Sequence, residues 1–201
     1  MGEMNLKSLV RPKKYKSFKG EVGAAAPNLL ERNFKATKPD EKWVTDVTEF
    51  NVDNGKVFLS TLMDLCTGEI VARAMDTRPS LSMVIDMLKK ALGKLGPDVK
   101  PMVHSDQGWQ YRMNRYQGML AKTGLVQSMS RKGNCHDNAP MESFFAVLKS
   151  EFFHLKKFTT ADELKSGLDE YIDYYNHHRI KMKLGGLSPV QYRAQLASVV
   201  C

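Results

Sequence analysis

Three strand-like stretches separated by very short turns restrict the fold of this chain more than any other feature. Residues 42–52, 56–66 and 69–76 are rich in β-branched and aromatic side chains, a composition typical of strands. An Asn-Gly pair at 54–55 and a Thr-Gly pair at 67–68 separate them. Turns this short connect antiparallel neighbours. The sequence therefore predicts an antiparallel three-stranded meander.

A strand–helix–strand unit follows the meander. Apolar residues recur at helical spacing over residues 80–95, and a Gly-Pro pair at 96–97 is predicted to end that helix. Next come a short strand that ends at Asp106, a helix over residues 114–122 and a strand over residues 125–130. This order implies an α/β fold, with a mixed five-stranded sheet flanked by helices on both faces.

Two more helices are predicted in the last third of the chain. The first opens with Asp137 or Asn138 as a cap and Pro140 in its first turn, after a polar loop that begins at Arg131. The second begins at Thr160 with a capping-box pattern. Both carry apolar side chains at helical spacing and should pack on the sheet.

Three acidic residues stand where packing provides no reason for a charge. Asp46 lies inside the first apolar strand, Asp106 ends the fourth, and Glu142 lies early in a helix rich in phenylalanine. A buried carboxylate is costly unless a cation compensates it, and three converging acids raise one another's pKa. Each acid taken singly is also explained by an ion pair or an exposed edge. Together they favour a divalent metal site, with the three acids converging at one edge of the sheet.

The charge distribution points to a polyanionic partner. The chain has 201 residues and a net charge of +8, and residues 1–36 hold 8 Lys or Arg against 3 Asp or Glu. Such a basic arm favours phosphate binding through counterion release, although a solvated leader would carry the same charges. No uncharged apolar run approaches the roughly 18 residues of a membrane helix, and we identify no secretion signal. Three widely spaced cysteines fit a reducing cytosol and offer no zinc-type spacing.

Four separated motifs resemble one known family. Residues 42–50, 104–111, 130–145 and the closing segments at 174–179 and 187–192 look like the retroviral-integrase-type catalytic core. More narrowly, they resemble bacterial insertion-sequence transposases that encode this core in a second reading frame. The 35 residues between the second and third acids match the Asp-Asp-35-Glu pattern of that family, and Lys149 matches its basic residue on the same helix. The resemblance covers about residues 30–195.

The resemblance implies a ribonuclease-H-like fold and a polynucleotidyl transferase with two Mg²⁺ or Mn²⁺ ions. Asp46 would bridge the ions, Asp106 would bind one and Glu142 the other. Such an enzyme cleaves element ends and joins 3′-hydroxyls to target DNA, so DNA and further copies of the chain are the expected partners, in the bacterial cytoplasm at the nucleoid. Residues 1–36 would trail a missing upstream DNA-binding region, residues 37–156 would form the core and residues 157–201 a helical extension.

Five basic residues are candidate contacts to DNA phosphates: Arg131, Lys132, His136, Lys149 and Arg179. A solvated helix face or ordinary loop polarity explains the same residues without DNA. His104 could hydrogen-bond near the second acid or be a satisfied strand-end histidine, and Asp64 could be an edge-exposed strand end.

Two other functions remain open from the sequence. One is a metal-dependent nuclease of the same fold, which would hydrolyse DNA without joining it. The other is a catalytically incompetent fragment that only binds DNA, as the basic arm allows.

Overall fold

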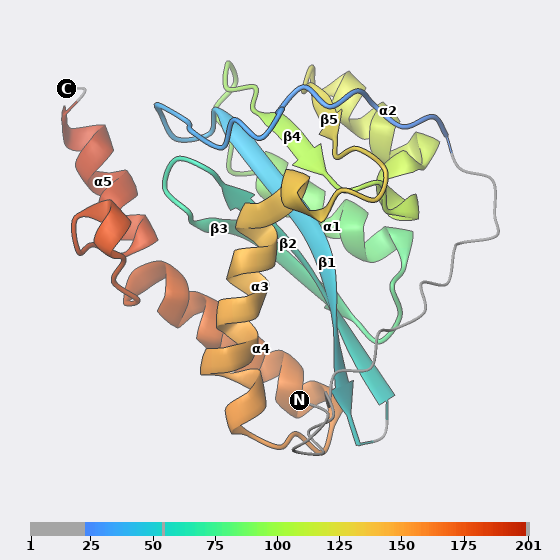
Figure 1. The fold of residues 1–201 in the computed structure, drawn as a ribbon, viewed down its shortest axis with the longest axis vertical. Coiled ribbons are helices and arrows are strands. Elements are labelled where there is room, and N and C mark those ends of the chain that lie inside the picture. The colour runs from blue at the N-terminus through green and yellow to red at the C-terminus, as the bar shows by residue number, and fades with distance from the viewer. Residues whose placement is uncertain (1–22, 54, 200–201) are drawn as a thin grey trace, which may run out of the picture.

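A five-stranded mixed sheet lies at the centre of the computed structural model, which describes residues 23–53 and 55–199 (Figure 1). The strands are β1 (Lys42–Val52), β2 (Gly55–Asp64), β3 (Ile70–Asp76), β4 (Met102–Ser105) and β5 (Gln127–Met129). Their order is β3-β2-β1-β4-β5. β1 is antiparallel to β2 and β2 to β3, whereas β4 lies parallel to both β1 and β5. The predicted meander and mixed sheet are confirmed; Asn54 of the predicted turn lies outside the described residues.

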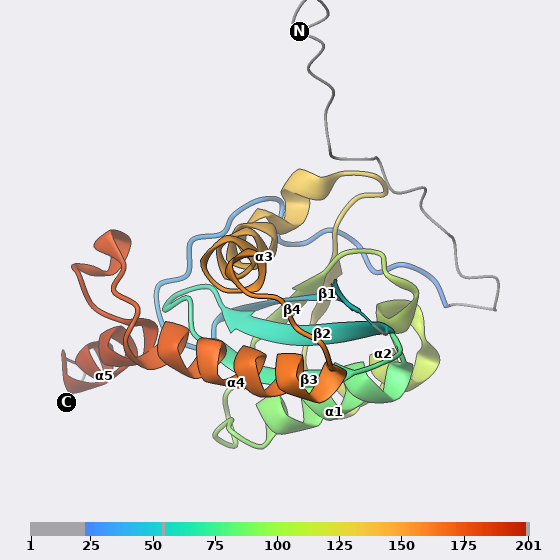
Figure 2. The same cartoon turned by 90° about the horizontal axis from the view of Figure 1, so that it is seen from below.

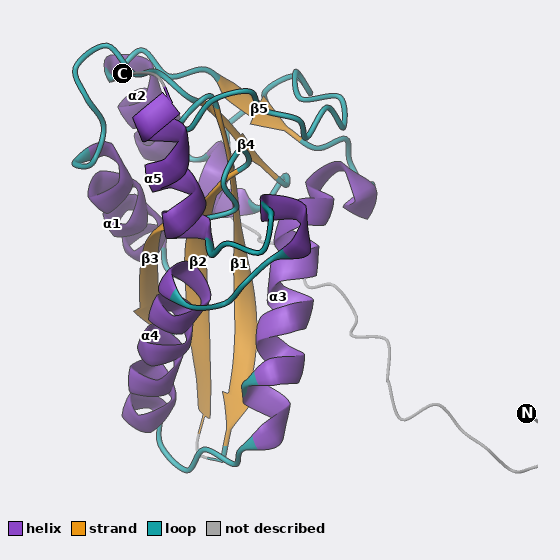
Figure 3. Cartoon of the chain, turned by 90° about the vertical axis from the view of Figure 1, so that its left-hand side faces the viewer, coloured by secondary structure: helices purple, strands orange, loops and turns teal. Residues whose placement is uncertain are grey.

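Helices cover both faces of the sheet, as predicted (Figure 2). One face packs against α1 (Leu81–Leu92) and α2 (Asn114–Lys122), and the other packs against α3 (Ala139–Glu151) and α4 (Ala161–His177). Figure 3 shows the sheet between α1 and α3. Because side chains alternate along a strand, Trp43 enters the core under α1 and α2 while Val44 enters the core under α3 and α4.

Local capping residues mark where α1 and α4 begin, and a glycine marks where α1 ends. The Ser80 hydroxyl accepts a hydrogen bond from the Met83 N–H at 3.3 Å and caps α1. That helix ends at Leu92, so the predicted end at residues 96–97 is wrong; Gly93, a poor helix former, takes the C-cap position. α4 has the predicted cap, with the Thr160 hydroxyl accepting from the Glu163 N–H at 3.2 Å. α5 (Pro189–Val199) lies in the segment expected to be a helical extension, but its bounds were not predicted.

Part of the predicted N-terminal arm packs on the core. Residues 1–22 lie outside the described residues, and residues 23–36 run past β5 (Figure 1, blue). The Met129 N–H donates to the Pro27 carbonyl at 3.1 Å, and the Leu30 side chain is 1% exposed. Residues 23–36 are therefore in contact with the core, while the domain division at residues 36 and 156 stays a prediction.

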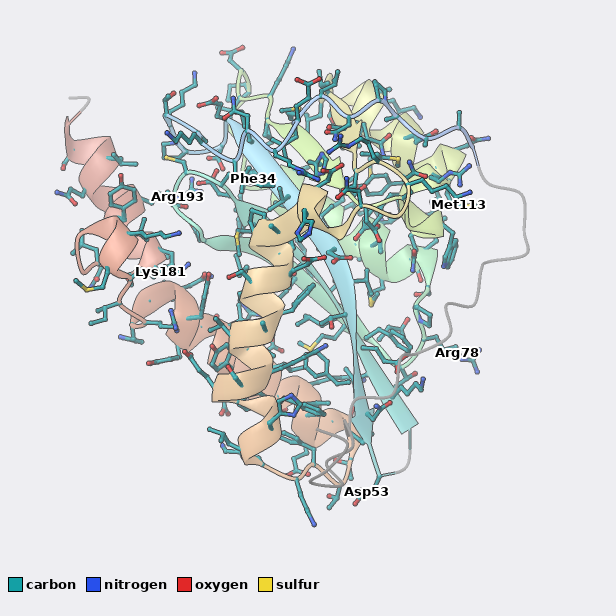
Figure 4. The ribbon with its side chains drawn as sticks, in the orientation of Figure 1. Phe34, Asp53, Arg78, Met113, Lys181 and Arg193 are labelled. Carbon is teal, nitrogen blue, oxygen red and sulfur yellow. The ribbon has the colours of Figure 1, made fainter. Side chains whose placement is uncertain are left out.

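A partly buried ion-pair cluster links α5 to the β2–β3 turn and to the segment just before β1 (Figure 4, Arg193). The Arg193 guanidinium contacts carboxylates of Asp40, Asp64 and Glu69. The idea that Asp64 is edge-exposed is wrong. Its side chain is buried, and it accepts hydrogen bonds from the Thr67 N–H and hydroxyl at 2.9 and 2.7 Å.

Within the described part of the chain, no helix is both long and apolar enough to cross a membrane.

Candidate functional site

Asp46 and Asp106 lie side by side at the centre of the sheet. The parallel register of β1 and β4 ends with Thr45 opposite Ser105, so the next residue on each strand is one of the two acids. Both acids follow the residues Val44 and His104 by two positions, and residues two apart on a strand share a face. This is the face covered by α3. The predicted convergence at a sheet edge is wrong because β1 is the middle strand.

The two carboxylates occupy an environment that opposes their ionisation. Burial and then the charge of Asp106 raise the pKa of Asp46 to about 8, and the charge of Glu142 adds to the effect. The Val47 N–H, which donates to Asp46 Oδ1 at 2.7 Å, and the Lys149 ammonium act in the opposite direction. Burial also raises the pKa of Asp106. Like charges held together in this way are stabilised by a bound cation.

Helix α3 brings the third acid and a lysine to the same face. Glu142 lies exposed in the first turn of α3, and the Lys149 ammonium lies 5.4 Å from the centre of the Phe50 ring on β1. Both residues influence the pKa of Asp46, so both lie within electrostatic range of it. Among residues 23–53 and 55–199, no three His, Cys, Asp or Glu side chains stand close enough together to hold a metal ion between them. The available ligands are carboxylate oxygens, the hard donors that Mg²⁺ and Mn²⁺ prefer.

His104 supports the site without taking part in it. Its ring nitrogens hydrogen-bond to the Ser128 and Ser130 hydroxyls at 2.8 and 3.1 Å. Burial lowers the pKa of His104 to about 4, so the ring is neutral at pH 7. The Gln107 amide donates to the Ser130 carbonyl at 3.1 Å, which adds a further hydrogen bond between the end of β4 and the segment after β5. The interpretation of His104 as a satisfied strand-end histidine is confirmed.

Gly108 is a site residue that the sequence analysis did not single out. Its N–H donates to Asp106 Oδ1 at 2.8 Å and orients that carboxylate. A Cβ atom at this position would lie 2.8 Å from the same oxygen and 3.3 Å from the Tyr111 ring. A glycine two residues after a strand-end acid was the available signal, but it indicates a turn equally well.

The predicted DNA contacts differ in how free their charges are. Arg131 pairs with Asp137 at 2.8 Å, and Arg179 forms a two-pronged pair with Glu151, with a closest contact of 2.6 Å. Two further candidates, Lys132 and His136, are exposed on the loop before α3. Contact of these residues and of Lys149 with DNA stays a prediction.

Family models match two adjoining parts of the chain. One model described as an integrase core domain matches residues 36–135, and a second with the same description matches residues 142–196. The first contains Asp46 and Asp106 and the second contains Glu142 and Lys149. Together they span the sheet and the helices that cover it.

The names of similar proteins agree with these family models. A putative transposase for insertion sequence element IS150 of Escherichia coli K12 is 54% identical over 195 residues, which cover 97% of this chain and 69% of the relative. A transposase-like protein of Haemophilus influenzae is 50% identical over 192 residues, covering 96% and 88% respectively. The fold matches the HTLV-2 integrase catalytic core in complex with magnesium, with a TM-score of 0.60, 16% identity and coverage of 79% of this chain and 99% of that one. On these family models and relatives, and with its ribonuclease-H-like sheet, this chain belongs to the bacterial insertion-sequence transposases that carry an integrase-type core.

Proposed function

We propose that the chain is a DNA strand transferase that cleaves the ends of an insertion element and joins the resulting 3′-hydroxyls to target DNA. The observation that carries this proposal is the pairing of Asp46 with Asp106 on neighbouring parallel strands, with Glu142 in electrostatic range. Acids packed this closely disfavour the metal-free ionised state, which is the property expected of a cation site. The close insertion-sequence relatives support DNA as the substrate.

Each side chain has a definite part in this proposal. Asp46, Asp106 and Glu142 would together hold two divalent cations through their carboxylate oxygens. When bound, the two cations would activate the attacking hydroxyl and stabilise the departing oxygen. The Gly108 N–H would keep the Asp106 carboxylate oriented, because it already donates to that oxygen at 2.8 Å.

The DNA would lie across the α3 face of the sheet. Lys149 on α3 would contact a phosphate beside the acids, and Lys132 and His136 would contact the strand that passes the preceding loop. Arg131 and Arg179 would contribute through the outer edges of guanidinium groups that are already paired with Asp137 and Glu151. Two element ends must react together, so the active species would contain more than one copy of the chain.

Strand joining provides the decisive assay. The chain is incubated with a labelled duplex that bears a recessed 3′-hydroxyl, a supercoiled plasmid and Mn²⁺, in parallel with its Asp106→Asn and Asp98→Asn variants. Asp98 is exposed and lies outside the site, so Asp98→Asn is the matched control. The proposal expects joined products from wild type and from Asp98→Asn, and at least about a hundredfold less from Asp106→Asn. Joining that persists in Asp106→Asn would overturn the assignment.

The same assay separates the two other readings. Hydrolysed duplex without joined plasmid would indicate a metal-dependent nuclease. Salt-sensitive binding of the duplex without cleavage or joining would indicate a DNA-binding fragment.

A further inference from the structure

The carboxylate of Asp137 is the most heavily bonded acidic group near the site. It is buried and accepts five hydrogen bonds at 2.8–3.1 Å. Three come from the backbone and guanidinium of Arg131, one from the Arg32 guanidinium and one from the Asn28 amide. The guanidinium of Arg131, followed by that of Arg32, keeps the pKa of Asp137 well below its usual range. We name Asn28, Arg32, Arg131 and Asp137 the loop clamp.

The loop clamp stands directly before the helix that carries Glu142. Asp137 belongs to a short turn, Cys135–Asn138, that leads into α3. The next residue, Asn138, occupies the N-cap position of α3, yet its side chain makes no capping hydrogen bond. Its amide instead donates to the Thr45 carbonyl at 3.2 Å, one residue before Asp46. The start of α3 is therefore held on one side by the loop clamp and on the other by the strand that carries Asp46.

The N-terminal half of the loop clamp is itself held on the sheet. The N–H groups of Leu29 and Leu30 donate to the Ser128 hydroxyl on β5 at 2.9 and 3.1 Å. The Arg32 guanidinium also donates to the Asn134 side chain at 2.9 Å, within the loop before α3. Residues 28–32 thus contact both β5 and that loop, although they lie about a hundred residues away from either in sequence.

We propose that Asp137 is a positioning residue: through Arg32, Arg131 and Asn28 it fixes the start of α3 and so sets where Glu142 stands relative to Asp46 and Asp106. The inference rests on the proposed function for the role of the three acids. It adds that residues 28–32 are part of the architecture of the site. Displacement of Arg32 would therefore leave the position of Glu142 less fixed, although Arg32 contacts none of the three acids.

The test measures the loop and the metal site separately. Hydrogen–deuterium exchange reports on residues 131–145, and titration calorimetry reports Mn²⁺ affinity, for wild type and for Asp137→Asn, Arg32→Ala and Arg32→Lys. Leu88→Ala is the control, because Leu88 is fully buried under the opposite face of the sheet and its loss lowers stability away from the loop.

The proposal expects faster exchange over residues 131–145 and about tenfold weaker Mn²⁺ binding in Asp137→Asn and Arg32→Ala. Arg32→Lys, which keeps the charge but loses the fork, should recover part of both effects. Leu88→Ala should bind Mn²⁺ as wild type does. Unchanged exchange in Asp137→Asn, or equal loss of affinity in Leu88→Ala, would overturn the proposal.

Failure of the proposed function has a different signature. If wild type binds no Mn²⁺, or if Asp46→Asn binds it equally well, the metal assignment of the acids fails. The exchange measurement then decides the loop clamp alone: faster exchange at residues 139–145 in both Asp137→Asn and Arg32→Ala supports it, and unchanged exchange in either variant rejects it.

Discussion

Asp46→Asn should make the metal-free protein more stable while it abolishes metal binding. The carboxyl of Asp46 has its pKa raised from the ordinary value of 3.8 to about 8 by burial and by Asp106. An acid whose pKa is higher in the folded state opposes folding as the pH rises above its unfolded value. Asparagine keeps the acceptor for the Val47 N–H but cannot ionise.

The size of the effect follows from the span between the two pKa values. The penalty is absent below about pH 4, grows by about 1.4 kcal/mol for each pH unit above 3.8, and levels off above pH 8. At pH 7 it amounts to on the order of 4 kcal/mol. The variant should therefore exceed wild type by that amount at pH 7 and match it near pH 4.

Urea unfolding from pH 4 to pH 8 with a chelator present measures this difference directly. Asp98→Asn, at an exposed position, should follow wild type at every pH. Added Mn²⁺ at a hundred times its dissociation constant should stabilise wild type by about 2.7 kcal/mol and leave Asp46→Asn unchanged. A variant no more stable than wild type at pH 7, or a difference that does not shrink as the pH falls, would refute the reasoning.

Three further substitutions test packing and ion pairing elsewhere in the fold, each by urea unfolding. Gly167→Ala places a Cβ 2.6 Å from the Phe152 ring and should cost about 1–3 kcal/mol, whereas Gly118→Ala meets no atom within 4 Å and should add up to about 1 kcal/mol; equal gains would contradict the clash. Arg193→Met leaves three carboxylates without their guanidinium partner and should lower the free energy of unfolding by about 3 kcal/mol. An unchanged stability would rule out the ion-pair cluster as an anchor of α5. Thr61→Val removes a buried hydroxyl that has no hydrogen-bond partner in the described part of the chain and should add about 1 kcal/mol, while Thr61→Ser should not.

Much of the architecture was readable from local patterns. β-branched and aromatic stretches separated by short turns indicated the meander, because strand propensity and turn length depend on residues near one another in the chain. Asp46, Asp106 and Glu142 stood out because an acid inside an apolar strand or helix needs compensation. The cap at Thr160 was likewise local, since its partner lies three residues away.

Other predictions failed where local rules compete with tertiary contacts. Asp64 looked like an exposed strand end, yet Arg193, more than a hundred residues away, makes its burial tolerable. Asn138 takes the predicted N-cap position of α3, but its amide donates to the Thr45 carbonyl and its side chain makes no capping hydrogen bond. Neither contact partner can be identified from spacing along the chain.

The sequence by itself determined where strands and helices form and the family that the motifs indicate, and it singled out the three acids as candidate site residues. Only the tertiary structure decided that β4 lies parallel to β1, which places Asp106 beside Asp46 in the middle of the sheet. It also decided that Arg32 reaches Asp137 and holds the start of the helix bearing Glu142. The periodicity of a segment shows which of its side chains face the core. Strand register and ion pairs depend instead on which segment, distant in sequence, packs against it.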